Sequence, residues 1–303
     1  MEKEERFFIN STCDGLRLGV TEINTDSKPK GIVQISHGMS ENRSRYIEFM
    51  RYLSNRGYIS IIHDHRGHGE SVKNKNDLGY FYNNGANFIV KDLFQINSYI
   101  KEKHKGLPVT LLGHSMGSLV ARSFLKNYSY SIDKLVLCGP PTENKMVDMG
   151  IMVCKLLGKF HSSHHRSKFL NKLVFKNYDK GFYNENDWLC SDPEVVKKYR
   201  ENEMCGFIFT LNGFMTLFSL IKEVYSRKGW SNINETLPIL FIAGSDDPVI
   251  QSKKHFEEAQ RFLSDIGYKK ISQKLYKDKR HELLNEKGKE KIYDDIINWV
   301  ETY

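Results

Sequence analysis

The stretch PVTLLGHSMGSLV, residues 108–120, decides the fold of this chain. An apolar run typical of a buried strand ends at Gly113-His-Ser115-Met-Gly117, and a helical pattern follows at once. A tight turn between a strand and a helix brings two backbones together, and glycine is needed where a Cβ would clash. We therefore expect Ser115 at the apex of this turn, at a helix N-terminus where developing negative charge is stabilised. This context predicts that Ser115 is a nucleophile.

Strand-like and helical segments alternate on both sides of this stretch. The expected strands cover residues 6–10, 16–23, 31–36, 58–63, 109–112, 135–139, 237–243 and 271–276. Such alternation implies right-handed crossovers, and it predicts an α/β fold with a mostly parallel eight-stranded sheet flanked by helices. Ligands bind at the carboxyl ends of the strands in sheets of this kind, and Ser115 falls at such an end.

The alternation stops between residues 140 and 232. Helices are expected at 146–158, 167–176, 194–204 and 206–227, and no strand is expected there. The simplest interpretation is a helical cap inserted after the sixth strand. It predicts two domains, a core of residues 1–139 and 233–303 and a cap (lid) of residues 140–232. The uncharged run 204–221 contains polar side chains and two glycines, so we do not expect it to span a membrane.

The second half of the chain supplies partners for the serine. Asp246 and Asp247 follow the seventh expected strand, and His281 lies in the loop after the eighth. A serine hydroxyl needs a base within hydrogen-bond reach, and the base needs a carboxylate that fixes its tautomer. The two aspartates compete for this role, and we favour Asp247 because Pro248 biases it to an extended conformation. The predicted triad is Ser115, Asp247 and His281.

Five motifs together resemble the α/β-hydrolase family of monoacylglycerol lipases, lysophospholipases and serine aminopeptidase S33-type hydrolases. They are His37-Gly38-x-x-Glu41 with Arg45-Tyr46, Asp64-His65-Arg66-Gly67-His68-Gly69-x-Ser71, Gly113-His114-Ser115-Met116-Gly117, Gly244-x-x-Asp247-Pro248 and Arg280-His281-Glu282. The resemblance implies an α/β-hydrolase fold, an oxyanion hole formed by the backbone N–H groups of Met39 and Met116, and hydrolysis of a monoacyl lipid ester through an acyl-enzyme. It implies no metal and no organic cofactor.

Other functions stay open at this point. A serine aminopeptidase resembling proline iminopeptidase and a short-chain carboxylesterase share the fold, and a negatively charged pocket would favour the aminopeptidase. A non-catalytic binding module is disfavoured by the complete set of triad residues.

Three residues are candidates for substrate binding. Phe214 and Phe218 belong to an apolar cap helix, where they either pack in the core or line an acyl pocket that excludes water. Glu41 either positions a leaving group or water, or is an ordinary carboxylate at the start of a helix.

The net charge of +8 is unevenly distributed. Residues 144–180 hold eight Lys or Arg and two Asp. The basic segment is interpreted either as a solvated helical face or as a surface that contacts anionic lipid together with neighbouring apolar side chains. No recognition fold for nucleic acid accompanies it. The sequence leaves the oligomeric state undetermined.

Histidine-rich segments raise the question of metal. His63-x-His65-x-Gly67-His68 resembles a zinc motif, but Gly67 stands where an aspartate ligand is required. We expect a polar loop in which Asp64 and Arg66 pair with each other or with backbone, and a solvated loop at 161–165. Five cysteines without a Cys-x-x-Cys pair, and an N-terminus without an apolar signal core, predict a cytoplasmic protein.

Overall fold

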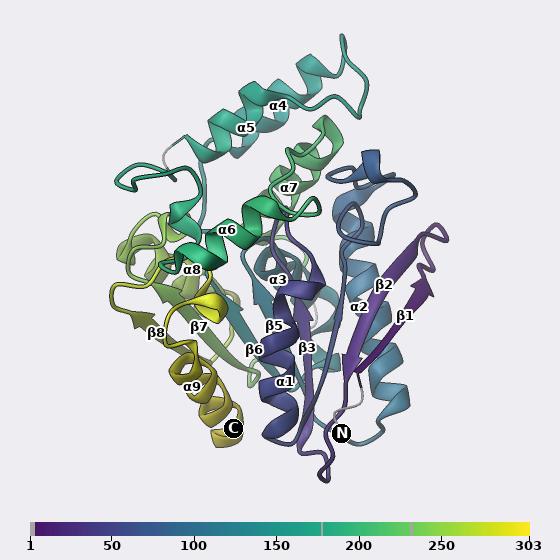
Figure 1. The fold of residues 1–303 in the computed structure, drawn as a ribbon, viewed down its shortest axis with the longest axis vertical. Helices are drawn as coiled ribbons and strands as arrows, with labels where there is room; N and C mark the ends of the chain where they lie inside the picture. Colours follow the sequence, from purple (N-terminus) through teal and green to yellow (C-terminus); the bar gives the residue numbers. More distant parts are fainter. Residues whose placement is uncertain (1–3, 177, 231–232) are drawn as a thin grey trace.

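The computed structural model describes residues 4–176, 178–230 and 233–303, and a mostly parallel sheet of eight strands forms its centre (Figure 1). The strand order is β1-β2-β4-β3-β5-β6-β7-β8, and only the β1–β2 and β2–β4 pairs are antiparallel. The strands are β1 (Glu4–Asn10), β2 (Arg17–Ile23), β3 (Gly31–Ser36), β4 (Tyr58–His63), β5 (Val109–His114), β6 (Lys134–Cys138), β7 (Pro238–Gly244) and β8 (Lys270–Tyr276). The predicted fold class is confirmed.

Helices cover both faces of this sheet. The α-helices are α1 (Ile47–Asn55), α2 (Gly85–Lys103), α3 (Met116–Tyr128), α4 (Val147–Leu157), α5 (Lys168–Phe175), α6 (Pro193–Glu201), α7 (Leu211–Val224), α8 (Lys253–Ile266) and α9 (Lys289–Thr302). The 3-10 helices are η1 (Arg43–Tyr46), η2 (Lys75–Asp77), η3 (Ser129–Ser131), η4 (Asp187–Leu189), η5 (Pro248–Ile250) and η6 (Leu283–Asn285).

Two apolar cores lie on opposite faces of the sheet, because side chains along a strand alternate between its faces. In β7, Ile239 and Phe241 join the core that includes α2, α3 and α8, whereas Leu240 and Ile242 join the core that includes α1 and α9. The central strands are therefore buried on both faces, which explains their continuous apolar runs.

The insertion between β6 and β7 is helical, and the described residues between those strands contain no β-strand. Figure 1 shows α4 and α5 farthest from the sheet, with α6 and α7 between them and the strands. The helix expected at 206–227 starts instead at Leu211, because the Thr210 side chain caps it by accepting the Gly213 N–H. The division into core and cap domains stays a prediction, and its boundary at 232/233 adjoins residues 231–232, which lie outside the described residues. Within the described ranges no helix is long and apolar enough to cross a membrane.

Candidate active site

Ser115 occupies the turn between β5 and α3. Its backbone has φ +50° and ψ −121°, a conformation rarely adopted by residues other than glycine. The Ser115 N–H donates to the Cys138 carbonyl at 2.9 Å, which ties the turn to the neighbouring strand β6. A Cβ on Gly117 would lie 2.0 Å from the Ser36 carbonyl oxygen, so glycine is required where α3 starts. The turn thus presents Ser115, still partly exposed, at the end of β5.

His281 and Asp247 lie in direct contact. The His281 Nδ1 is 2.9 Å from the Asp247 Oδ2, and both side chains are almost fully buried. The other carboxylate oxygen of Asp247 accepts the Val249 N–H at 2.8 Å. Asp246, by contrast, is exposed and accepts a hydrogen bond from Ser245. Of the two competing aspartates, Asp247 is therefore the one in contact with the imidazole, and its φ of −77° and ψ of 110° are extended.

A segment of the insertion around η4 holds the loop that carries His281. The Glu282 N–H donates to the Leu189 carbonyl at 2.7 Å, and the His281 N–H donates to the Trp188 carbonyl at 3.4 Å. The Arg280 guanidinium donates to the backbone carbonyls of Asp187 at 2.6 Å and Cys190 at 2.9 Å. The position of the imidazole thus depends on backbone from the inserted helices.

Ser115 and His281 line one cavity of about 760 Å³, together with Met39 and Met116. Met116 is the first residue of α3, so its N–H has no partner inside the helix. Neither the Met116 N–H nor the Met39 N–H donates to another group of the described residues. Both amides are therefore available to a ligand atom in the cavity, which is the property an oxyanion hole needs.

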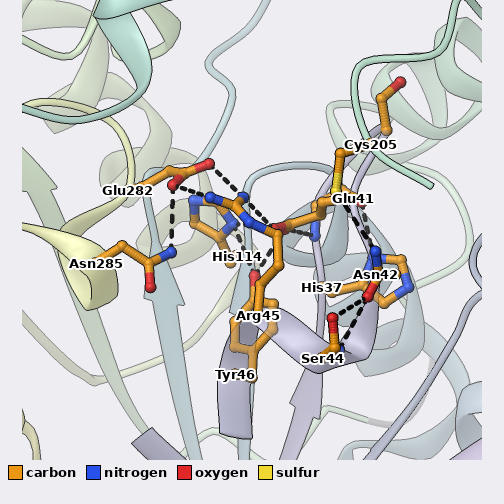
Figure 2. A network of polar contacts seen from close by, with 12 residues as sticks. His37, Glu41, Asn42, Ser44, Arg45, Tyr46, His114, Cys205, Glu282 and Asn285 are labelled. Atoms are coloured by element: carbon orange, nitrogen blue, oxygen red, sulfur yellow. Dashed lines mark hydrogen bonds and ion pairs between the residues drawn. The ribbon is translucent and has the colours of Figure 1, made fainter. Parts of the chain in front are cut away.

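A network of buried charges lies beside this cavity (Figure 2). The Arg45 guanidinium donates to both carboxylate oxygens of Glu282, at 2.5 and 2.6 Å, and to Glu41 at 2.9 Å. The other oxygen of Glu41 accepts from the Tyr46 hydroxyl at 2.7 Å and lies 3.1 Å from the His114 Nδ1. One arginine thus pairs with two carboxylates contributed by residues more than 200 positions apart in the chain.

The network sets the charge of its members. Burial alone would raise the pKa of Glu41, but the hydrogen bond and charge of His114 and the charge of Arg45 lower it well below its ordinary value. Burial alone would lower the pKa of His114, whereas its hydrogen bond with Glu41 and the charge of that carboxylate raise it. The His114 ring lies 4.8 Å from the His281 ring, so an ionised network borders the candidate base.

The profile of the serine aminopeptidase S33 family matches residues 27–288. The chain belongs to this family. It is 26% identical to the monoacylglycerol lipase of Mycolicibacterium smegmatis over 293 residues, which cover 94% of this chain and 93% of that protein. It is 25% identical to the rat monoglyceride lipase over 296 residues, covering 95% and 88% of the two chains.

Solved structures show the same fold as this S33 hydrolase. A thermostable carboxyl esterase from Bacillus coagulans in complex with glycerol superposes with a TM-score of 0.89 at 22% identity, covering 100% of this chain and 99% of that one. A soluble variant of the Saccharomyces cerevisiae monoglyceride lipase with a substrate analog superposes with a TM-score of 0.77 at 21% identity, covering 100% and 95%. At this identity the likeness establishes the α/β-hydrolase fold alone.

The remaining predicted site residues differ in their access to the cavity. Phe218 and Glu41 line it, whereas Phe214 is not among its lining residues. Phe214 lies one turn earlier in α7, fully buried, with its ring 6.2 Å from that of Phe218 and 6.0 Å from that of Phe209. Phe214 is thus a core residue behind Phe218, since this part of α7 packs inward.

Sequence reasoning assigned no role to Arg45 or Glu282 of this S33 family member, although both belong to the quoted motifs. The signal for Arg45 was its spacing of four residues from Glu41, which suits an ion pair on one turn. No local signal identified Glu282 as the second partner, because the pair forms across the fold.

The histidine-rich loop of this hydrolase is a packed layer. The rings of His37 and His65 lie with centroids 4.4 Å apart and are tilted by 45°, and burial lowers the pKa of both His63 and His68 to about 3. The described residues contain no group of three or more His, Cys, Asp or Glu side chains arranged to hold a metal ion.

The expected contacts of the two histidine-rich loops are found in part. Asp64 accepts the backbone N–H groups of Arg43 at 2.8 Å and Glu70 at 2.9 Å, as expected, but its ion pair is with Arg43 and not with Arg66. Arg66 instead contacts Asp92 at 2.8 Å, because α2 brings that carboxylate into the same buried space. Residues 161–164 of the second loop are exposed as expected, and His164 in addition stacks on Tyr80 with ring centroids 3.7 Å apart.

Proposed function

We propose that this S33 hydrolase is a serine carboxylic-ester hydrolase that acts on monoacyl lipids, a monoacylglycerol or a lysophospholipid. The observation that carries the proposal is that His281, paired with Asp247 at 2.9 Å, lines one cavity with Ser115 on its strained turn. A cavity of about 760 Å³ has the size of a ligand site and accommodates a long acyl chain. The relatives named as monoacylglycerol lipases support the substrate class.

In this mechanism Ser115 Oγ attacks the ester carbonyl carbon while His281 Nε2 takes its proton. Asp247 holds His281 Nδ1–H and stabilises the imidazolium. The N–H groups of Met39 and Met116 donate to the carbonyl oxygen as it becomes an oxyanion. The tetrahedral intermediate collapses, the alcohol leaves with the proton from His281, and an acyl-enzyme remains. Water, deprotonated by His281, then releases the fatty acid and restores Ser115.

The cavity has an apolar part that suits the acyl chain. Its apolar lining includes Leu119, Val147, Leu173, Val174, Phe207, Leu217, Phe218 and Ile221. Of the two phenylalanines predicted to contact the acyl chain, Phe218 lines this apolar part. Glu41, at the polar side of the cavity, is the candidate contact for the leaving group.

A serine aminopeptidase is the alternative function that the carboxylates of the cavity favour. Binding of a peptide amino terminus calls for a carboxylate that is not already neutralised. Glu41 and Glu282 line the cavity and share one cation, Arg45, and Asp179 and Glu185 line the cavity as well. Turnover of aminoacyl amides compared with esters therefore decides between the two functions.

Turnover measured on a panel of substrates tests this function. Purified wild-type protein and the Ser115→Ala variant are compared on monoacylglycerols, lysophospholipids, short nitrophenyl esters and aminoacyl amides. We expect the highest kcat/KM on a long-chain monoacyl lipid, and loss of this activity in Ser115→Ala. Fastest turnover of the aminoacyl amides would favour the aminopeptidase, and full activity of the alanine variant would remove Ser115 from the mechanism.

We further propose that the surface of α4 and α5 contacts anionic membranes. It exposes large apolar side chains, which are Met146, Met149, Met152, Leu156, Phe160 and Phe169. Seven exposed lysines accompany them, which are Lys145, Lys155, Lys159, Lys168, Lys172, Lys176 and Lys180. Arg166 does not add its charge to this surface, because its guanidinium donates to the backbone carbonyls of Asn76, Leu78 and Ile208. Apolar and cationic side chains on one face are typical of interfacial helices.

Vesicle co-sedimentation checks this surface. Each lysine near an anionic surface contributes about 1 kcal/mol, so the Lys155→Gln/Lys159→Gln double variant is expected to bind phosphatidylserine vesicles about 30-fold more weakly. The matched control is Lys253→Gln/Lys254→Gln on α8, which removes two exposed lysines elsewhere and is expected to bind like wild type. Equal binding to neutral and anionic vesicles, or equal losses in both variants, contradicts the prediction.

A further inference from the structure

Three polar groups of Ser40 connect the loop after β3 to its surroundings, one to His68 and two to the segment between α6 and α7. Its N–H donates to His68 Nε2 at 3.3 Å, its hydroxyl donates to the Phe207 carbonyl at 2.8 Å, and its carbonyl accepts the Gly206 N–H at 2.9 Å. The residue is buried, and its φ of +52° is unusual for serine. A backbone conformation of this kind persists only where the surroundings hold it.

Two of these contacts come from the segment 204–207, between α6 and α7. The same segment is bound a second time by Asn42, whose Nδ2 lies 3.4 Å from the Cys205 Sγ and 3.5 Å from the Met204 carbonyl (Figure 2). The segment therefore runs beside the loop of residues 38–42 and is bonded to it at successive positions.

His68 presents a fixed acceptor to this loop. Its Nδ1–H donates to the Arg66 carbonyl at 3.1 Å, which leaves Nε2 free to accept from Ser40. Burial lowers the pKa of His68 to about 3, so the ring stays neutral at ordinary pH. The ring also packs edge-on against Phe207 and Phe209, at 5.3 and 5.4 Å between centroids.

These bonds bracket the Met39 amide. The Gly38 N–H donates to Glu41, and the Ser40 N–H donates to His68. The N–H between them, that of Met39, donates to no group of the described residues. Because the amides of Gly38 and Ser40 are both hydrogen-bonded, the direction of the Met39 N–H between them is fixed.

We propose that Ser40 is a positioning residue for ester hydrolysis, which couples the segment 204–207 to the oxyanion hole by holding the Met39 N–H toward the cavity. This inference rests on the proposed function, because it assigns the Met39 N–H to the oxyanion. It adds that the cap takes part in transition-state stabilisation and does not merely cover the substrate. Loss of a whole oxyanion donor lowers kcat by about 10²–10³, so loosening one lowers it by less.

The test compares wild type with Ser40→Ala and His68→Phe on a soluble nitrophenyl ester. We expect each variant to lower kcat by about 10- to 100-fold while KM changes little, because ground-state binding does not use the oxyanion hole. A trifluoromethyl ketone, which forms a tetrahedral oxyanion adduct, is expected to bind more weakly by a similar factor. The matching methyl ketone is expected to bind as in wild type.

Thr210→Val is the matched control. Thr210 donates its hydroxyl to the Gly79 carbonyl at 2.9 Å, so it also links the inserted helices to the core, but away from the loop of residues 38–42. We expect Thr210→Val to lower Tm and to leave kcat within about twofold of wild type. A Ser40→Ala variant that is folded and keeps wild-type kcat overturns the inference, as does equal weakening of both ketones. Failure of the proposed function itself is distinguishable, because wild-type protein would then neither turn over esters nor bind the trifluoromethyl ketone.

Discussion

Replacing Asp247 with asparagine is expected to lower kcat for ester hydrolysis by about 10⁴-fold. The buried Asp247 carboxylate accepts from His281 Nδ1, which leaves Nε2 free to take the serine proton. An asparagine amide in the same place stabilises an imidazolium poorly, and its NH₂ group favours the wrong tautomer of His281. The measurement is kcat on the preferred ester, with circular dichroism to verify the fold.

Asp246→Asn provides the matched control for that experiment. It makes the same chemical change one residue away, at an exposed side chain that contacts Ser245 and not His281. We expect its kcat to stay within about twofold of wild type. Equal losses in the two variants, or a larger loss in Asp246→Asn, would show that the carboxylate of the triad has been misassigned.

Arg45→Met is expected to lower the free energy of unfolding by about 3–5 kcal/mol. The variant leaves Glu41 and Glu282 buried without their shared counterion, and methionine offers no donor in exchange. It also removes the guanidinium that lies 5.0 Å from the centre of the Tyr199 ring of α6. Urea unfolding at neutral pH measures the effect.

The pH dependence of this effect has a definite sign. In wild type the pKa of Glu41 is lowered, so its stabilisation is present above its ordinary pKa of 4.5 and is lost as pH falls. Without Arg45 the buried Glu41 carboxylate gains a proton more readily, and the variant recovers stability relative to wild type as pH falls. The difference between the two proteins is therefore expected to shrink on acidification.

Arg56→Met is the control for the arginine experiment. Arg56 pairs with Asp294 at 2.7 Å, but both side chains are more than 40% exposed. Solvent screens such a pair, and we expect a loss below about 1 kcal/mol. Similar losses for the two arginine variants would mean that burial of the Arg45 network contributes little to stability.

Local patterns were sufficient for the fold and for the candidate nucleophile. The order of strand, tight turn and helix around Ser115 depends on neighbouring residues, as does the extended conformation of Asp247 before Pro248. Hydrophobic periodicity alone did not predict where α7 begins, since the helix was expected from residue 206 and starts at Leu211. The apolar spacing continues through 206–210, but contacts of this segment with Ser40 hold it outside the helix.

Partners in buried ion pairs could not be read from local sequence. Asp64 and Arg66 are two residues apart, yet each pairs with a side chain from another element. The same holds for Glu282, whose partner lies 237 residues away. Such pairs depend on which elements the sheet topology brings together, and neither spacing nor composition encodes that.

The hydrogen bonds from His281 and Glu282 to the carbonyls of Trp188 and Leu189 bear on protein engineering. A chimaera that takes the whole insertion of a relative would also exchange the backbone that supports the imidazole. If both crossover points lie between residue 143 and residue 185, the chimaera retains the host chain's backbone that supports the imidazole and the host chain's segment 204–207. We therefore expect grafting confined to α4 and α5 to change part of the apolar lining of the cavity and to leave the support of His281 in place.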